Sequence, residues 1–374
     1  MKVIHVISGG DIGGAKTHVI SLLKELKNRI DVDLVCFMEA TFSEEAKKNG
    51  INTEVIVQKG RWDIGAVKKL ADKIKTKKYD IIHCHGARAN FIAILLKLFC
   101  SVPTVTTIHS DYRLDFQGDI FKNIVFKNIN AFSLRFIDYY IGVSNSFKDM
   151  MIERGFPKDK VYSVYNGISF DEKISCINKE EFYKKYGIPY EKDSIYVGIM
   201  GRLHPVKGHE VFLDGAALAY KKNKDLRFLI AGDGEEEERL KEYARKLNID
   251  HVTHFLGFMK NPYDFFNAID INTLTSYSES FPYVILEGAI MKKPIISSRV
   301  GGIEDMIFNG DTGYVFEKGD FKSLGDRILS LAQSKEMRFK IGNNLYNFVK
   351  ENFSTKNMAD QHIKIYEKII QNKR

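Results

Sequence analysis

The sequence predicts an α/β fold made of two doubly wound parallel sheets, each covered by helices. Three observations support this prediction. Short apolar segments alternate with helical segments, the alternation starts again after a polar stretch near the middle, and glycine-rich loops follow several of the apolar segments. Short, continuously apolar strands that alternate with helices are typical of parallel sheets buried on both faces. A chain of 374 residues also has the length of two ordinary domains.

The first half is expected to form one Rossmann-like domain over residues 1–170. Its expected strands are residues 3–7, 32–37, 55–57, 81–83, 105–108 and 139–143, and the segment 164–168 closes this half. Helices are expected at 18–26, after a glycine loop, and at 145–154. We expect the carboxyl-terminal helix, about 358–374, to complete this domain.

Residues 171–192 are polar and charged, and we interpret them as a linker. The second domain is expected over 193–357, with strands at 196–200, 227–231, 253–255, 271–274 and 294–297. Its expected helices are 209–220, 235–247, 261–268, 282–291, 322–333 and 335–348. In such sheets ligands bind at the carboxyl ends of the strands, so we expect the two domains to face one another across a ligand-binding cleft.

Composition is that of a soluble globular protein, with 44% hydrophobic and 28% charged residues. No apolar run is long enough for a transmembrane helix, and the amino terminus lacks the apolar region of a signal peptide. Four scattered cysteines without paired spacing are typical of free thiols in a reducing compartment. We therefore expect a cytoplasmic protein.

The tripeptide His83-Cys84-His85 has the composition of a metal site. Residues on a strand alternate between its two faces, and no second ligand pair follows in the sequence. We therefore expect no metal site and no cofactor, and we interpret His5, His83 and His85 as structural.

The net charge of +8 is unevenly distributed. Residues 1–170 contain 25 Lys and Arg against 18 Asp and Glu, a difference of +7, and the remainder contains 31 against 30. A basic half fits an anionic membrane surface or substrate, and it equally fits a lysine-rich solvated surface. Nucleic acid is not an expected partner, because only charge supports it. Apolar and basic residues at helical spacing in 112–140 suit either an interfacial amphipathic helix or a core helix with a solvated edge.

Two loops of the second half carry the expected phosphate-binding chemistry. Residues 201–208, Gly-Arg-Leu-His-Pro-Val-Lys-Gly, follow a strand and precede a helix. Arg202 and Lys207 there can neutralise a diphosphate without a metal ion. Gly232-Asp233-Gly234 follows the next strand, which places two glycine loops at neighbouring strand ends.

The segment 279–287, Glu-Ser-Phe-Pro-Tyr-Val-Ile-Leu-Glu, places one carboxylate on a loop and another eight residues later in a helix. We expect Ser280 to act as the N-cap and Pro282 to lie in the first turn. Free amides at a helix start form an anion site. Loop acid, amides and helix acid together can hold a nucleotide diphosphate sugar.

These motifs, with Val300-Gly301-Gly302, resemble the donor site of retaining glycosyltransferases of family 4, which have the GT-B fold and include glycogen synthase and sucrose-phosphate synthase. Segments 9–14, 107–109, 143–144 and 166–168 also resemble that family, so the similarity covers nearly the whole chain. A dinucleotide fingerprint is absent from the first glycine loop, which disfavours a dehydrogenase.

The resemblance implies a role for each matching position. Arg202 and Lys207 would bind the donor diphosphate, Glu279 and His109 would contact the donor sugar, and Glu287 would accept hydrogen bonds from the ribose. The remaining positions implied to contact the donor are Gly13, Gly14, Gly201, Gly232, Gly257, Phe258, Phe281 and Tyr283. The amides of Phe281 and Tyr283 would touch phosphate or sugar, and Gly257 with Phe258 would meet the base. Retention of configuration, without a metal ion, is also implied.

Two further residues are candidates for the acceptor side. Lys16 follows the glycine loop where the family often has Glu, so a phosphate- or carboxylate-bearing acceptor is one interpretation. Trp62, the single tryptophan, either stacks on an acceptor sugar or packs at an interface.

The sequence thus predicts a hexosyltransferase-type glycosyltransferase that moves a sugar from a nucleotide sugar, most often UDP-linked in this family, to a glycan or lipid-linked acceptor of the bacterial cell envelope. The inner face of the cell membrane is a candidate location. A nucleotide-sugar epimerase and a catalytically silent scaffold of the same fold stay open as alternatives. The sugar, the base, the acceptor and the oligomeric state are not encoded in recognisable motifs.

Overall fold

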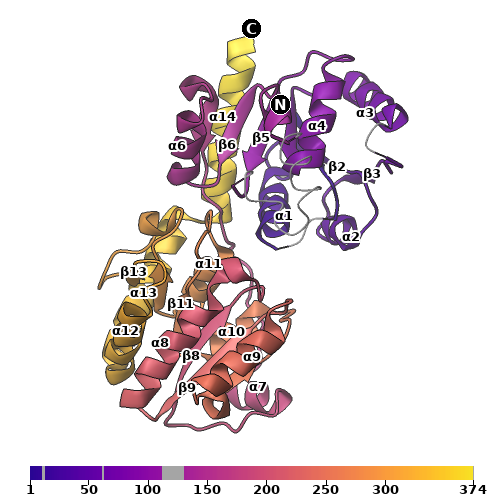
Figure 1. Ribbon diagram of the computed structural model, residues 1–374. Coiled ribbons are helices and arrows are strands. Elements are labelled where there is room, and N and C mark those ends of the chain that lie inside the picture. The colour runs from indigo at the N-terminus through magenta and orange to yellow at the C-terminus, as the bar shows by residue number, and fades with distance from the viewer. Residues whose placement is uncertain (11–12, 61–62, 112–129, 374) are drawn as a thin grey trace. The chain divides into compact units, whose positions relative to one another are not determined.

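The computed structural model (Figure 1) describes residues 1–10, 13–60, 63–111 and 130–373. The chain forms two compact units: Met1–Ser169 together with Ser354–Arg374, and Phe170–Phe353. Each unit is an α/β structure with one parallel sheet, as the repeated alternation of strands and helices predicts. None of the helices within the described residues is long and apolar enough to cross a membrane.

The first unit contains a seven-stranded parallel sheet in the order β3-β2-β1-β4-β5-β6-β7. The strands are β1 (Lys2–Ile7), β2 (Asp31–Cys36), β3 (Thr53–Val55), β4 (Ile81–His85), β5 (Thr104–Ile108), β6 (Tyr139–Gly142) and β7 (Val161–Ser163). The strand order reverses direction between β1 and β4. The sheet is therefore doubly wound, and this reversal is where such sheets bind ligands.

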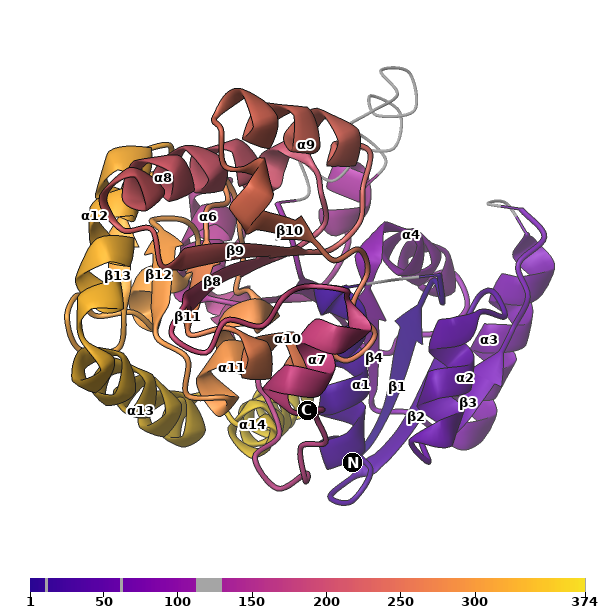
Figure 2. The same cartoon turned by 90° about the horizontal axis from the view of Figure 1, so that it is seen from below.

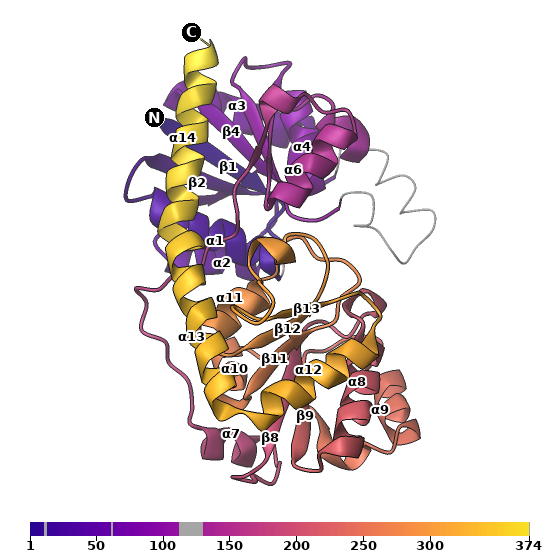
Figure 3. The same ribbon diagram turned by 90° about the vertical axis from the view of Figure 1, so that its left-hand side faces the viewer.

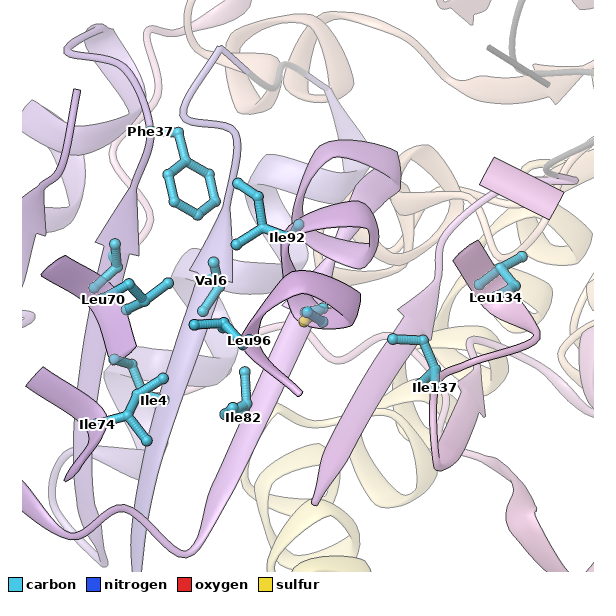
Figure 4. Packing of buried hydrophobic residues seen from close by; sticks show 14 of the residues in the cluster. Ile4, Val6, Phe37, Leu70, Ile74, Ile82, Ile92, Leu96, Leu134 and Ile137 are labelled. Carbon is cyan, nitrogen blue, oxygen red and sulfur yellow. The ribbon is translucent and has the colours of Figure 1, made fainter. Parts of the chain in front are cut away.

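Side chains of β1 alternate between two apolar layers. Ile4 and Val6 pack with residues such as Leu70 and Ile92 from the helices α3 (Ile64–Lys77) and α4 (Gly86–Leu96), as Figure 4 shows. Val3 and Ile7 point to the opposite face, which is covered by other helices. This two-residue period is a consequence of strand geometry.

The opposite face is covered by α1 (Gly14–Leu26) and α14 (Thr355–Lys373). Tyr366 and Ile369 of α14 are fully buried there beside Val19 and Leu23 of α1. Figure 3 shows α14, at the yellow end of the colour scale, running alongside this sheet. The end of the chain therefore helps to build the unit that the start of the chain begins. The other helices of this unit are α2 (Thr41–Lys48), α6 (Asn145–Glu153) and the 3₁₀ turn η1 (Lys158–Lys160).

The second unit contains a six-stranded sheet in the order β10-β9-β8-β11-β12-β13. The strands are β8 (Ile195–Met200), β9 (Leu226–Ala231), β10 (Thr253–Phe255), β11 (Ile271–Leu274), β12 (Ile295–Ser298) and β13 (Tyr314–Phe316). The helices are α7 (Lys179–Lys185), α8 (His209–Lys222), α9 (Glu237–Lys246), α10 (Pro262–Ala268), α11 (Tyr283–Ile290), α12 (Phe321–Gln333) and α13 (Lys335–Asn352). Short 3₁₀ turns are η2 (Pro205–Lys207), η3 (Asp250–Val252) and η4 (Ile303–Asp305).

Several element boundaries differ from those expected. Helix α1 begins at Gly14, four residues before the expected start at His18, because the helix continues into the glycine loop. The last strand of the first sheet, Val161–Ser163, was not predicted from the sequence, and it ends just before the segment 164–168. Gly167 in that segment instead lies against the returning chain, and a Cβ added to it would be 2.6 Å from the Ser354 carbonyl oxygen. Strand β13 was not predicted from the sequence.

Helix α7 lies within residues 171–192, which were expected from the sequence to form a polar linker. Its N-cap, Asn178, accepts a hydrogen bond from the Glu181 amide, and Phe182 and Tyr183 are fully buried against residues such as Phe265. Two buried aromatic side chains anchor this short helix, although charged residues dominate its sequence.

Candidate functional site

The candidate site of the second unit lies at the carboxyl end of β8, where the strand order reverses between β8 and β11 (Figure 2). The loop 201–208 follows β8 directly. On one side, the Leu203 amide donates to the Asp233 carbonyl oxygen at 2.7 Å. On the other side, the Tyr277 amide donates to the Val206 carbonyl oxygen at 2.8 Å. The predicted glycine loops of neighbouring strands are therefore in contact at the sheet's switch point.

Glycine is required where these loops approach one another most closely. Gly232 has φ +133, and a Cβ there would be 1.9 Å from the Gly201 carbonyl oxygen. Gly208 has φ +63, and its Cβ would be 2.2 Å from the Thr275 carbonyl oxygen. Both positions combine a backbone conformation that favours glycine with no room for a side chain. The loops are thus fixed by backbone packing.

Two cations of the β8 loop differ in their surroundings. Lys207 Nζ forms an ion pair with Glu279 Oε1 at 2.6 Å, and Ser276 Oγ donates to the same oxygen at 2.6 Å. The Arg202 side chain is exposed, and its guanidinium makes no ion pair or hydrogen bond within the described residues. The site thus holds a fixed Lys–Glu pair beside an uncompensated arginine, which favours the binding of an anion.

Helix α11 begins differently from the expectation. The N-cap position is Pro282 rather than Ser280, the first helical residue is Tyr283, and no side chain caps the helix. Ser280 instead contributes its carbonyl oxygen, which accepts a hydrogen bond from the Gly302 amide at 3.0 Å. A helix start without a side-chain cap leaves its first amides to other partners.

Glu287 lies on α11, one turn after Tyr283. Burial raises the pKa of the Glu287 carboxyl group to about 7. Burial, and then the charge of Glu287, raises the pKa of Tyr283. The Tyr283 hydroxyl is buried and has no hydrogen-bond partner among the described residues. Burying a carboxylate without hydrogen bonds costs free energy, and hydrogen bonds from the hydroxyl groups of a ligand would reduce that cost.

The loop after β10 joins the same edge of the sheet. The Gly232 amide donates to the Gly257 carbonyl oxygen at 2.8 Å, and Gly257 has a positive φ of 67°. Phe258, which follows, is 72% exposed. The Phe281 ring, in contrast, is buried, and its centroid lies 5.0 Å from that of Phe353. Phe258 can therefore offer a ring to a ligand, whereas Phe281 can offer only its backbone.

In the first unit, the candidate residues Gly13 and Gly14 form the start of α1. Gly13 is the N-cap, with φ +66, and no side chain caps this helix. Lys16 Nζ forms an ion pair with Glu45 Oε2 at 2.5 Å. The charge of Lys16 is thus balanced within the protein, which weakens its case as an anion-binding residue. Trp62 and residues 112–129 of the amphipathic segment lie outside the described residues.

His109 follows the last residue of β5, and its Nε2 lies 3.2 Å from His85 Nδ1. His85 belongs to a buried group with His5 and His83, whose ligand-type nitrogens all lie within 4.8 Å of one another. Strand geometry places Cys84 on the other face, as expected, but it leaves His83 and His85 on the same face, because residues two apart on a strand share a face. The three histidines could hold a metal ion by their spacing, and they are the main feature that the sequence reasoning missed. The signal was the two-residue spacing itself.

Comparison with known proteins identifies both units. Residues 12–172 match the family described as Glycosyltransferase Family 4, and residues 178–348 match Glycosyl transferases group 1. The chain belongs to glycosyltransferase family 4. It has the GT-B fold and is a glycosyltransferase of the hexosyltransferase type.

Relatives of this glycosyltransferase extend over most of its length. It is 28% identical over 324 residues to the N-acetyl-alpha-D-glucosaminyl L-malate synthase of Bacillus anthracis, covering 86% of this chain and 83% of the relative. It is 24% identical to an Escherichia coli UDP-Gal:alpha-D-GlcNAc-diphosphoundecaprenol alpha-1,3-galactosyltransferase, covering 83% and 81%. Among solved structures, HepE of Anabaena in complex with UDP-glucose has a TM-score of 0.83 at 21% identity, covering 98% of this chain and 100% of HepE.

Proposed function

We propose that this glycosyltransferase transfers a sugar from a nucleotide diphosphate sugar, with retention of configuration and without a metal ion. The donor is a UDP-sugar, and the acceptor is a glycan or a lipid-linked glycan in bacterial cell-envelope polysaccharide or glycolipid synthesis. The observation that carries this proposal is the uncompensated Arg202 beside the Lys207–Glu279 pair, at the switch point of the second sheet.

Arg202 and Lys207 bind the donor diphosphate and stabilise the negative charge that grows on it as it leaves. Lys207, held by Glu279, and Arg202, unpaired among the described residues, supply positive charge for this task, because hydrogen-bond donors aimed at a developing charge supply much of the rate enhancement in many enzymes. The amides of Phe281 and Tyr283, near the uncapped start of α11, add further donors. Gly201 and Gly232 let the phosphates approach the backbone.

Glu287 accepts hydrogen bonds from the ribose hydroxyls, and the loop of Gly257 and Phe258 contacts the base. Glu279 contacts the donor sugar through its second carboxylate oxygen, since Lys207 and Ser276 engage the first. From the first unit, the proposal assigns His109 to the donor sugar at the reaction centre, and Gly13 and Gly14 to the donor phosphate or the acceptor.

The reaction breaks the bond between the sugar's anomeric carbon and the diphosphate oxygen, and it forms a bond from that carbon to an acceptor hydroxyl oxygen. The proton of the acceptor hydroxyl passes to the leaving diphosphate on the same face of the sugar. The transition state has oxocarbenium character, so positive charge develops on the sugar ring while negative charge develops on the leaving diphosphate. No step requires a covalent enzyme intermediate.

The relatives support the choice of donor and acceptor. HepE binds UDP-glucose, and the E. coli relative moves galactose from UDP to a sugar carried on diphosphoundecaprenol. A lipid-linked acceptor would bring the enzyme to the cytoplasmic face of the membrane, and the surplus of +7 in residues 1–170 supports contact with anionic lipids. Flotation with vesicles containing anionic lipid tests that contact, and absence of binding at low salt would refute it.

The activity test is direct. The purified enzyme is incubated with radiolabelled UDP-glucose, UDP-galactose or UDP-N-acetylglucosamine and a lipid-linked acceptor, with EDTA present. Transfer of label to the acceptor with an unchanged anomeric configuration supports the proposal. Conversion of one UDP-sugar to another without an acceptor would instead identify an epimerase, and inertness towards every donor would favour a scaffold.

A further inference from the structure

Six of the ten histidines gather in the first unit, on the face of the sheet that α1 and α14 cover. They are His5, His18, His83, His85, His109 and His362. The closest ring centroids, those of His83 and His85, are 4.4 Å apart. Five of these side chains are almost completely buried, and His109 is partly exposed at the edge of the group. Burying so many imidazoles costs free energy unless their nitrogens are hydrogen-bonded, so their hydrogen-bond partners indicate where the ring protons lie.

Strand register explains how three of these side chains come together. His5 on β1 is paired with His83 on β4, and His85 on β4 is paired with Thr107 on β5. The neighbours Val3 and Ile7 on β1 belong to the apolar layer beneath α1 and α14. The two-residue period therefore directs the polar side chains into that same layer. Tyr366 of α14 is fully buried in this layer as well.

Six side chains form one linear series of hydrogen bonds, which we call the histidine network: Thr107, His83, Tyr366, His5, His85 and His109. Thr107 Oγ1 lies 2.7 Å from His83 Nε2, and His83 Nδ1 lies 2.5 Å from the Tyr366 hydroxyl oxygen. The same hydroxyl lies 3.4 Å from His5 Nε2. His5 Nδ1 lies 3.0 Å from His85 Nε2, and His85 Nδ1 lies 3.2 Å from His109 Nε2.

Proton counting constrains this network strongly. Burial keeps the pKa of His5, His83, His85 and His109 well below the usual value, so all four rings are neutral at pH 7. A neutral imidazole has one N–H and one lone pair, and a hydroxyl has one proton to donate. In a linear series, each member therefore donates to one neighbour and accepts from the other. The Tyr366 oxygen has two lone pairs and could accept from both His83 and His5, but its own buried proton would then have no acceptor among the described residues. When every buried proton of the series has an acceptor, all five bonds point in the same direction.

Thr107 sets that direction. If His83 donated to Thr107, the buried Thr107 hydroxyl proton would face no acceptor among the described residues. An unsatisfied buried donor costs about 1–3 kcal/mol. Thr107 therefore donates to His83, His83 to Tyr366, and so on until His85 Nδ1–H donates to His109 Nε2. The proton of His109 is then on Nδ1.

We propose that Thr107, His83, Tyr366, His5 and His85 are positioning residues that hold His109 in the tautomer with the proton on Nδ1. His109 then presents an N–H donor to the oxygen atoms of the donor sugar rather than a lone pair. The consequence for catalysis rests on the proposed function, which places His109 at the sugar, whereas the tautomer itself does not.

The hydrogen bonds also bear on the metal site that His5, His83 and His85 could form by their spacing. All six ring nitrogens of these residues already have a hydrogen-bond partner in the network. A bound metal ion would take lone pairs that the network uses and would break it. Metal binding and the histidine network are therefore mutually exclusive.

Nuclear magnetic resonance tests the proposal directly. Long-range ¹H–¹⁵N correlation of the ¹⁵N-histidine-labelled full chain separates protonated from unprotonated ring nitrogens, and the spectrum of His109→Gln assigns the His109 signals. The proposal predicts a protonated Nδ1 and an unprotonated Nε2 for His109. A protonated Nε2 in the wild-type protein would overturn it, as would one equivalent of bound metal found by elemental analysis of the native protein.

Variants test whether the network controls this tautomer. Tyr366→Phe keeps the ring and removes the central hydroxyl, so His109 should populate both tautomers. Tyr140→Phe is the matched control, because the Tyr140 hydroxyl is also buried but donates to the carbonyl oxygens of Leu134 and Ile137. It should leave the His109 signals unchanged. An unchanged tautomer in Tyr366→Phe would overturn the proposal.

A second pair of variants covers the case in which Tyr366→Phe fails to fold. The amide nitrogen of Asn occupies a position similar to His Nδ1, so His85→Asn retains a donor to His109, whereas His85→Leu does not. We expect the wild-type tautomer in His85→Asn and a mixture in His85→Leu. Identical His109 spectra for the two would contradict the proposal.

Activity measurements connect the tautomer to catalysis. We expect kcat to fall about tenfold or more in Tyr366→Phe and His85→Leu, with the KM for the nucleotide sugar little changed, because an incorrect tautomer removes a transition-state contact. His85→Asn should recover most of the kcat. If the wild-type enzyme transfers no sugar at all, the proposed function fails while the spectra still decide the tautomer. A tautomer shift without loss of kcat would remove the catalytic part of the inference.

Discussion

Replacing Glu287 with Gln should stabilise the unliganded protein and weaken nucleotide binding. Burial raises the pKa of this carboxyl group from 4.5 to about 7. A difference of about 2.5 pKa units corresponds to about 3 kcal/mol, which the folded protein loses when Glu287 ionises. Gln has a similar shape without the charge. The variant should therefore gain up to about 3 kcal/mol of unfolding free energy at high pH.

The sign of the pH dependence follows from the raised pKa. The folded state binds the Glu287 proton more tightly than the unfolded state. The contribution of Glu287 to the free energy of unfolding is therefore fully present below about pH 4.5 and is lost as the pH rises through about 7. The stability difference between Glu287→Gln and the wild type should thus be small at pH 5 and largest at pH 8. Urea unfolding at both pH values measures it.

A matched control is Glu242→Gln on α9, an exposed position whose substitution should change stability little at either pH. Titration calorimetry measures the affinity of Glu287→Gln for UDP. Loss of a charged acceptor should weaken UDP binding by about 2 kcal/mol, or roughly thirtyfold. Wild-type UDP affinity should also fall as the pH drops below about 7, because the carboxylate becomes protonated. Lower stability of Glu287→Gln at both pH values, or unchanged UDP affinity, would refute the reasoning.

Three further predictions concern the same unit. Arg202→Ala and Lys207→Ala should each abolish transfer while the circular dichroism spectrum stays native, and wild-type turnover in either variant would contradict the assignment. Gly232→Ala should destabilise the fold by more than about 2 kcal/mol, because its Cβ would overlap the Gly201 carbonyl oxygen. Gly60→Ala should not, because no atom of the described residues lies within 4 Å of the added Cβ. Both are measured by urea unfolding. EDTA should leave transfer unchanged, and loss of activity that Mg²⁺ or Mn²⁺ restores would refute metal independence.

The periodicity of the sequence was enough to predict the two parallel sheets, because most strands are short apolar runs and several of them end at a glycine loop. It also predicted that Arg202 and Lys207 lie beside the loop of Gly232, since neighbouring parallel strands end at the same edge. The roles assigned to these residues stay predictions. Local sequence could not reveal the Lys207–Glu279 pair, which joins residues 72 positions apart.

Two errors show where local reasoning fails. Ser280 has the chemistry of an N-cap, but the chain continues to Pro282 before the helix begins, because the Ser280 carbonyl oxygen is held by Gly302. His5, His83 and His85 were treated separately, although the pairing of β1 with β4 and a tyrosine from the last helix bring them into one network. Register and the return of the chain terminus are tertiary facts that no short motif encodes.

Calorimetric titration of the wild-type enzyme and of Arg202→Ala with UDP, GDP, ADP and NAD, in the presence of EDTA, tests the central claim most directly. The account predicts selective binding of UDP by the wild type and a loss of binding in the variant. Binding of none of the nucleoside diphosphates, or equal UDP binding by the wild type and Arg202→Ala, would contradict it.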